Sequence, residues 1–277
     1  GKVVRMMTRD GHGRLWIATE DGGVGILDTR TGKTVPFTGI RGLGANVHSL
    51  YYDRRNDEMW IGTFRNGLFR YNLRTGHIRR YYHERGLESD AIFYITAQKN
   101  GTLWVATTLG LRRYDPKTDM FCKTGDWFLD TSFIYTLHVD SKDNVWAGST
   151  VFGLFVMNTK RHRVIHWNVG DCGLDDKYVT CVYQDRRGRV WIGTNNNGMQ
   201  VMDQQTGIIM TVCPNSALQH STVCSIVEDR HGHIWTGTGN GLYMYDPEHN
   251  ELVRYTSEDG LPTNQMNFSS SYVSASG

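Results

Sequence analysis

The chain has 277 residues, a formal net charge of +2, 12% aromatic residues and only 5 prolines. Positive and negative residues are mixed along the sequence, so it predicts no clustered basic face for a nucleic-acid backbone. No apolar run approaches the roughly 18 residues that a membrane helix needs, and the chain shows no signal peptide and no initiator Met. We expect a piece of a longer protein that does not report its own targeting.

A short phrase built around tryptophan recurs through the chain at intervals of 42 to 45 residues. In its fifth copy the phrase reads Arg189-Val190-Trp191-Ile192-Gly193-Thr194. The repeated tryptophans are Trp16, Trp60, Trp104, Trp146, Trp191 and Trp235. A strand-rich repeat of about 40–45 residues is typical of a β-propeller, in which each repeat forms one four-stranded antiparallel sheet, or blade. The predicted fold class is therefore all-β.

Each repeat is predicted to contain four strands, here called A to D, and the fifth repeat shows their order. Its β-rich runs are 179–184, 189–194, 199–202 and 208–212. The segments between them are rich in Asp, Asn and Gly, which suit tight turns and the left-handed backbone region. The blades therefore read as simple meanders of hairpins.

The repeats divide the chain into six complete blades and the start of another. The predicted blades are 1–46, 47–91, 92–133, 134–178, 179–222 and 223–266, and 267–277 is predicted to be the inner strand of an incomplete blade. In that last segment, Asn267 to Ser274 reads as a strand and Gly277 stands where a turn glycine belongs. We expect one domain, part of a seven-bladed propeller that is completed outside this chain. A six-bladed ring with a trailing strand is the alternative.

Residues that recur in every repeat are interpreted as scaffold, because a functional site breaks symmetry whereas a scaffold repeats it. The acidic residue six positions before Trp recurs as Asp10, Asp140, Asp185 and Asp229, with Gln98 in the third repeat. The Trp is expected to pack between blades, and the Gly-Thr that follows it to let the sheets approach closely.

The cysteines favour neither a metal site nor a catalytic one. Their number is odd and no CxxC occurs, so we expect no metal and no cofactor. They are interpreted as small hydrophobic residues, and Cys181 and Cys224 are expected to point to different faces of adjacent blades. The cysteines are Cys122, Cys172, Cys181, Cys213 and Cys224.

The repeat phrase resembles the two-component regulator propeller repeat. The best copy runs from Asp229 to Thr238 and continues with Gly241-Leu242 and Tyr245-Asp246-Pro247. The resemblance extends over all six repeats, and Gly260-Leu261-Pro262 is similar to the family's inter-blade loop. No Trp-Asp dipeptide closes a repeat, which separates the chain from the WD40 type.

This resemblance implies a sensor role in the extracytoplasmic, periplasmic part of a hybrid two-component system of Bacteroidetes. Such receptors carry two seven-bladed propellers and a small β-sandwich ahead of a membrane helix, a histidine kinase and a response regulator. Many detect oligosaccharides released from polysaccharides and control the genes for their use. The expected partners are thus an oligosaccharide, the neighbouring propeller and β-sandwich of the same chain, and a second copy in a homodimer. The repeat motif itself supplies no ligand residues.

Binding is expected where the loops are irregular. In a four-stranded meander the B–C turns and the D-to-A loops open on one face, and these loops vary in length whereas the others are short and uniform. The most unusual loop holds Asp126, Trp127, Phe128 and Asp130. An aromatic plate flanked by carboxylates suits stacking on a sugar ring and hydrogen-bonding its hydroxyls. Packing against a neighbouring blade and contact with a partner domain are the alternatives.

Other candidates lie at the starts of the A strands and in the B–C turns. The A-strand candidates, expected to point to the central channel, are His48, Tyr94, Tyr135, Tyr178 and Thr222. Asn196 lies in a B–C turn, and Arg41 and Arg65 are candidates for sulfate or uronate groups. The channel residues equally suit filling the bore.

Three function classes remain open from the sequence. A non-catalytic sensor module is favoured, and a protein-interaction scaffold is the first alternative. A propeller lyase or hydrolase is the second, with Asp90, Asp171, Asp175 and Asp176 as available carboxylates. No nucleophile–base pair stands out, so no catalytic residue and no enzymatic activity is predicted for this domain, and kinase activity is expected elsewhere in the full-length protein.

Overall fold

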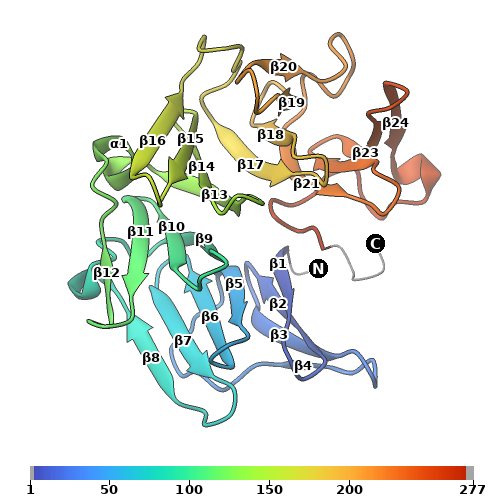
Figure 1. Ribbon diagram of the computed structural model, residues 1–277. Helices are drawn as coiled ribbons and strands as arrows, with labels where there is room; N and C mark the ends of the chain where they lie inside the picture. Colours follow the sequence, from blue (N-terminus) through green and yellow to red (C-terminus); the bar gives the residue numbers. More distant parts are fainter. Residues whose placement is uncertain (1–2, 273–277) are drawn as a thin grey trace. The chain divides into compact units, whose positions relative to one another are not determined.

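The computed structural model describes residues 3–272 and contains six four-stranded antiparallel sheets, each a meander of consecutive strands (Figure 1). These sheets are the blades of an all-β propeller, as the repeat predicted. The chain forms two compact units, Gly1–Ile134 and Tyr135–Gly277. Within the described residues, no helix is long and apolar enough to cross a membrane.

The first unit contains the first three blades. Their strands are β1 (Val4–Arg9), β2 (Arg14–Thr19), β3 (Gly23–Asp28) and β4 (Thr34–Pro36); β5 (Val47–Asp53), β6 (Glu58–Thr63), β7 (Leu68–Asn72) and β8 (Ile78–Tyr81); and β9 (Ile92–Ala97), β10 (Leu103–Thr107), β11 (Gly110–Asp115) and β12 (Met120–Cys122). A 3-10 turn, His83–Arg85, lies between the second and third blades, and the helix α1 (Trp127–Thr131) follows the third.

The second unit contains the other three blades, with the first residue of β13 at its boundary. Their strands are β13 (Ile134–Val139), β14 (Val145–Ser149), β15 (Leu154–Asn158) and β16 (Arg163–Trp167); β17 (Val179–Gln184), β18 (Val190–Thr194), β19 (Met199–Met202) and β20 (Ile209–Thr211); and β21 (Val223–Glu228), β22 (Ile234–Thr238), β23 (Gly241–Asp246) and β24 (Glu251–Tyr255). A second 3-10 turn spans Ser257–Asp259.

The segment after the sixth blade differs from the expected inner strand. Residues 267–272 contain a turn at Phe268 and Ser269 and no strand. The Ser270 side chain donates to the Asn267 carbonyl at 2.6 Å, which closes this turn. An inner strand is stabilised by the next strand of its own blade, and the segment has no such partner within the described residues. The rest of the predicted strand, and Gly277, lie outside the described residues, and the seventh blade stays a prediction.

Neighbouring blades pack through the repeated tryptophan. Trp16 lies 6.4 Å from Tyr71 of the second blade, and Trp60 lies 5.0 Å from Tyr114 of the third, between ring centroids. In the second unit, Trp191 lies 5.8 Å from Tyr245 of the sixth blade. The interpretation of these tryptophans as inter-blade packing is confirmed within each unit.

In the second and fifth repeats, the glycine two positions after the tryptophan makes room for the next blade. A Cβ atom on Gly62 would lie 2.6 Å from the Ile92 side chain of the third blade. One on Gly193 would lie 2.6 Å from the Val223 side chain of the sixth blade. Both distances are shorter than any real Cβ contact, so these positions require glycine, as the sequence predicted.

Candidate functional site

The repeated aspartates hold the tryptophans and the A–B turns. Asp185 Oδ2 accepts the Trp191 indole N–H at 2.9 Å, and Asp185 Oδ1 accepts the backbone N–H groups of Arg187 and Arg189. The same indole bond joins Asp10 to Trp16, Asp140 to Trp146 and Asp229 to Trp235, and Gln98 replaces the carboxylate opposite Trp104. A buried indole N–H needs an acceptor, so the scaffold interpretation of these aspartates is confirmed.

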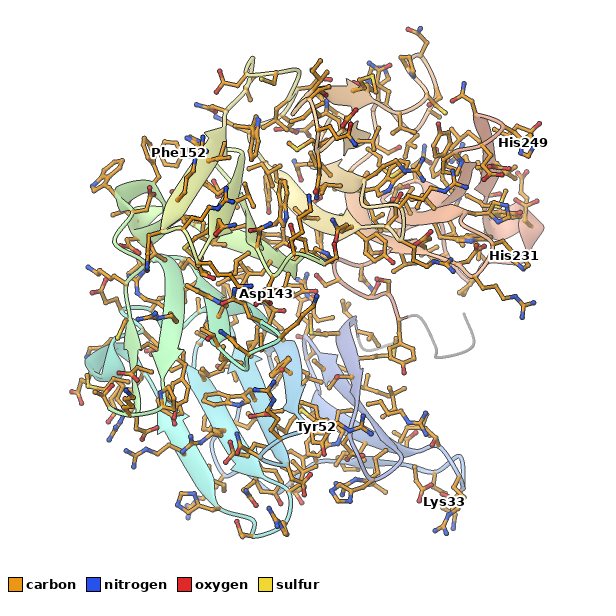
Figure 2. The ribbon with its side chains drawn as sticks, in the orientation of Figure 1. Lys33, Tyr52, Asp143, Phe152, His231 and His249 are labelled. Atoms are coloured by element: carbon orange, nitrogen blue, oxygen red, sulfur yellow. The ribbon has the colours of Figure 1, made fainter. Side chains whose placement is uncertain are left out.

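The Asp229 carboxyl shows the electrostatic consequence of this arrangement. Burial alone would raise its pKa, but hydrogen bonds from the Trp235 indole and from the His231 and His233 backbone outweigh burial and lower the pKa to about 2. Figure 2 labels His231, in the A–B turn of the sixth sheet, and His249, in its C–D turn. Both turns lie at the same end of the sheet as Asp229.

The loop that carries Trp127 folds into the one-turn helix α1 instead of staying irregular. Trp127 is 66% exposed and Phe128 is 38% exposed. Their rings meet edge to face, 5.0 Å apart. The loop therefore presents an exposed aromatic pair, called here the α1 surface.

The two aspartates that flank this pair are used by the loop itself. Asp126 caps the helix by accepting the Leu129 N–H at 3.0 Å. Asp130 is buried and accepts the backbone N–H groups of Thr124 and Gly125 at 2.7 and 2.9 Å. These hydrogen bonds hold the aromatic pair in place. The cap involves Oδ1 of Asp126, so contact between Asp126 and sugar hydroxyls stays a prediction.

A fully buried arginine completes this support and was missed by sequence reasoning. Arg112 donates to the carbonyls of Leu109 and Asp130 and to Glu88 Oε2 at 2.7 Å. It thus ties a B–C turn, α1 and the preceding D-to-A loop together. The sequence does contain a signal for Arg112, because the other five repeats have an uncharged residue at this position. These residues are Gly25, Phe69, Phe155, Gln200 and Tyr243.

His48 lies in an aromatic cluster of the first unit. Its ring stacks on Phe64 at 5.2 Å and meets the edge of Phe93 at 5.1 Å, and Phe133 lies 4.6 Å from Phe93. Arg65 lies over the outer face of Phe64, 5.9 Å from its centroid. Burial lowers the pKa of His48 to about 4, so the imidazole is neutral at pH 7.

Tyr94 does not occupy the strand position that corresponds to His48, and its contact with a ligand stays a prediction. The first strands carry a bulge that skips one residue, His48 in β5 and Phe93 in β9. Tyr94 therefore stands one position later in register and packs against the hydrophobic cluster of the first two blades. A shift of one residue moves a side chain to the other face of a strand, and the sequence count did not include this bulge.

In the second unit, Tyr135 and Tyr178 come together as expected. Their rings are 5.4 Å apart, and Phe268 lies 5.5 Å from Tyr135. Both tyrosines are half-buried. Asn196 is exposed in its B–C turn, which is held by the Asn196 N–H donating to Asp176 Oδ2 at 2.9 Å.

Three of the four carboxylates considered for catalysis accept structural hydrogen bonds, whereas the buried Oδ1 of Asp90 has no hydrogen-bond partner within residues 3–272. Asp175 Oδ2 accepts from Gln200 Nε2 and Thr211 Oγ1, at 3.0 and 2.7 Å. Asp176 accepts two backbone N–H groups, and Asp171 accepts one. This arrangement gives no specific support to a lyase or hydrolase mechanism.

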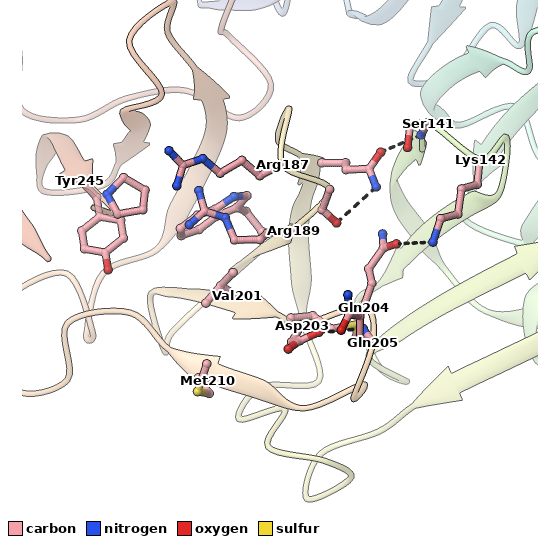
Figure 3. A pocket seen from close by; sticks show the side chains of 15 residues that line it. Ser141, Lys142, Arg187, Arg189, Val201, Asp203, Gln204, Gln205, Met210 and Tyr245 are labelled. Atoms are coloured by element: carbon pink, nitrogen blue, oxygen red, sulfur yellow. Dashed lines mark hydrogen bonds between the residues drawn. The ribbon is translucent and has the colours of Figure 1, made fainter. Parts of the chain in front are cut away.

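Two pockets lie at the turn end of the second unit, where the A–B and C–D turns meet. One, of about 580 Å3, is lined by residues of the fourth, fifth and sixth blades, and Figure 3 shows its side chains. The other, of about 490 Å3, adjoins it between the fourth and fifth blades. They lie at the opposite strand ends from the irregular loops, so the sequence did not select them.

Comparison with known proteins finds a family model that matches two stretches of the chain. Residues 173–196 and 217–240 match the two component regulator propeller model, and each match runs from a D-to-A loop to the next B–C turn. No curated protein matches the chain.

Among solved structures, the chain is similar to the extracellular domain of a hybrid two component system from B. thetaiotaomicron, at 24% identity and a TM-score of 0.77 over 95% of this chain and 36% of that one. It is also similar to PorZ, a surface component of the type-IX secretion system of Porphyromonas gingivalis, at 21% identity and a TM-score of 0.71 over 95% and 43% of the two chains. Virginiamycin B lyase from Staphylococcus aureus gives 14% identity and a TM-score of 0.73 over 92% and 84%. These identities establish the propeller fold. The chain spans less than half the length of the first two structures.

Proposed function

We propose that this chain, a propeller that carries two-component regulator repeats, is the ligand-binding part of an extracytoplasmic sensor, and that its ligand is an oligosaccharide. The repeat matches and the similarity to an extracellular receptor domain support the sensor role. In the full receptor, the proposed partners are a neighbouring propeller, a β-sandwich and a second copy, with a histidine kinase beyond the membrane. The proposed location is the periplasm.

The α1 surface carries this proposal. Trp127 is 66% exposed, yet its helix is capped by Asp126 and anchored by the buried Asp130 and Arg112. Holding an indole rigidly in water costs conformational entropy and buries little of the ring. A ligand that stacks on the ring buries it without a further entropy cost for this side chain. Flat aromatic rings suit the apolar face of a sugar ring, and the surrounding polar groups suit its hydroxyls.

Arg65 and the His48 cluster are a second part of the proposed surface in the first unit. Arg65 is exposed over Phe64, so its guanidinium remains available to a carboxylate or sulfate of the ligand. Tyr135, Tyr178 and Asn196 are proposed as contacts in the second unit. Tyr94, by contrast, packs on the blade core, which weakens its candidacy.

A thermal-shift screen of the chain against neutral, uronic and sulfated oligosaccharides tests the proposal. A ligand at about 100 times its dissociation constant should add roughly 2.7 kcal/mol to the unfolding free energy. Trp127→Ala should abolish the shift without lowering the melting temperature of the free protein, because the side chain is exposed. Val151→Ala, which shortens an exposed side chain in a B–C turn of the second unit, is the control.

If no oligosaccharide of the panel raises the melting temperature of the normally folded chain, the result would favour a protein-interaction scaffold. A hit on a neutral oligosaccharide that persists unchanged in Trp127→Ala would remove the α1 surface from the proposal.

A further inference from the structure

The two pockets at the turn end of the second unit adjoin across a shared wall and together form one candidate site. They share Lys142, Met202, Gln204 and Gln205. The wall between them is the C–D turn after β19 together with the side chain of Lys142. In Figure 3 a single dashed line joins Lys142 to Gln204 across this wall.

This wall is weakly held. Lys142 Nζ donates to Gln204 Oε1 at 3.4 Å, which is long for a charged donor. Both groups give up little if they separate, because Lys142 is exposed to water and the buried Gln204 Nε2 has no hydrogen-bond partner within residues 3–272. A ligand that accepts from both side chains would open a path between the pockets and satisfy that amide.

Basic side chains of the site can reach a ligand, although the carboxylates of Asp203 and Asp140 also line the two pockets. Lys142 forms no ion pair within the described residues. Arg187 pairs with Glu248, but both side chains are more than half exposed, at 58% and 57%. Exposed pairs of this kind contribute at most about 1 kcal/mol, so Arg187 can turn to a ligand at small cost.

The equivalent residue in the first unit is already used. Arg55 stands at the same turn position as Arg187, and its guanidinium donates to the backbone carbonyls of Lys99 and Asn100 in the next blade. In the fifth blade Arg186 makes the corresponding contacts, to the Asp229 and Arg230 carbonyls of the next blade, so that role does not fall to Arg187, which lines the larger pocket.

The remaining lining suits a hydroxyl-rich ligand. Side-chain amides of Gln184, Gln204 and Gln205 line the larger pocket, together with the half-buried ring of Tyr245. The smaller pocket adds Asn144, Asn158, Arg161 and the half-buried ring of Trp167, which stacks on Trp146 at 5.8 Å. Amide and guanidinium groups can hydrogen-bond the hydroxyls of a sugar, and the aromatic rings beside them can pack on its apolar faces.

We propose that this double pocket binds an acidic oligosaccharide, with one carboxylate on Lys142, a second carboxylate on Arg187, and hydroxyls on the glutamine amides. The ligand spans both pockets and replaces the hydrogen bond between Lys142 and Gln204. The site is separate from the α1 surface, and it rests on the proposed function only in taking a saccharide as the ligand.

Isothermal titration with the tetramer of galacturonic acid, and with its fully methyl-esterified form, tests the inference on the intact chain. The acid should bind and the ester should bind at least about tenfold more weakly, since a hydrogen bond to a charged group contributes about 1.5–3 kcal/mol. Lys142→Gln and Arg187→Gln should each weaken binding of the acid by about tenfold. Glu248→Gln should tighten it up to about fivefold, because it frees Arg187.

The controls separate this inference from the proposed function. Lys117→Gln, which removes an exposed lysine from a C–D turn of the first unit, should leave binding unchanged. Trp127→Ala should also leave it unchanged. Binding that is lost in Trp127→Ala and kept in Lys142→Gln would overturn the double pocket and support the α1 surface. Equal binding of acid and ester, equal binding of tetraglutamate, or no binding of the acid would each overturn the inference.

Discussion

At the scale of single residues, repetition separates structural from functional side chains. Asp185 is an example, since its two oxygens accept the indole of Trp191 and two turn N–H groups. The sequence predicted this role from regularity alone. It did not predict the burial of Arg112, because charged residues in strands are mostly exposed. Its burial depends on acceptors from three loops, Glu88 and the carbonyls of Leu109 and Asp130, which come together only in the fold.

The acid sensitivity of the sixth blade follows from Asp229. Its pKa of about 2 lies below the ordinary value of 3.8, so its ionised form stabilises the folded state. That contribution is fully present above pH 4 and is lost as the pH falls from about 4 through about 2. Asp229→Asn should therefore lower the unfolding free energy at pH 5, and the difference from the parent should shrink toward pH 2.

Urea denaturation at several pH values between 5 and 2 measures this difference. A gap between parent and Asp229→Asn that stays constant over the range would show that ionisation of Asp229 does not stabilise the blade.

At the scale of elements, the close approach of neighbouring sheets depends on glycine. Gly193→Ala should destabilise the chain by about 1–3 kcal/mol, because the new methyl group would overlap the Val223 side chain and the Cys181 Sγ atom. Gly25→Ala is the matched control in β3, where the nearest atom lies at 3.8 Å and the backbone is ordinary. Chemical denaturation of both variants should give a clear loss for the first and little change or a small gain for the second. The reverse order would contradict this packing.

Element boundaries were largely predictable, and the exceptions have physical causes. The predicted strands 179–184 and 199–202 coincide with β17 and β19. The bulge in each first strand was missed, because nothing in the composition of β9 marks Phe93 as the skipped residue. The helix α1 was missed because a single turn gives no periodic pattern, although Asp126 before Trp127 is an N-cap residue.

At the scale of the whole molecule, the repeat predicts the architecture but not the binding surface. Six equivalent sheets follow from six equivalent phrases, so the fold was accessible from the sequence. The pockets were not, because they arise where turns of different blades meet, and the turns were read as uniform. The lysine, arginine and glutamine residues that line them are unremarkable one at a time.

The proposed sensor role requires that a ligand changes the chain at the α1 surface. Amide hydrogen exchange of the intact chain, with and without a neutral oligosaccharide selected by the thermal-shift screen, measures this change directly. The account predicts slower exchange in residues 124–132, which contain α1 and its anchoring loop. Protection confined to the turns at the opposite strand ends, or no protection anywhere, would contradict it.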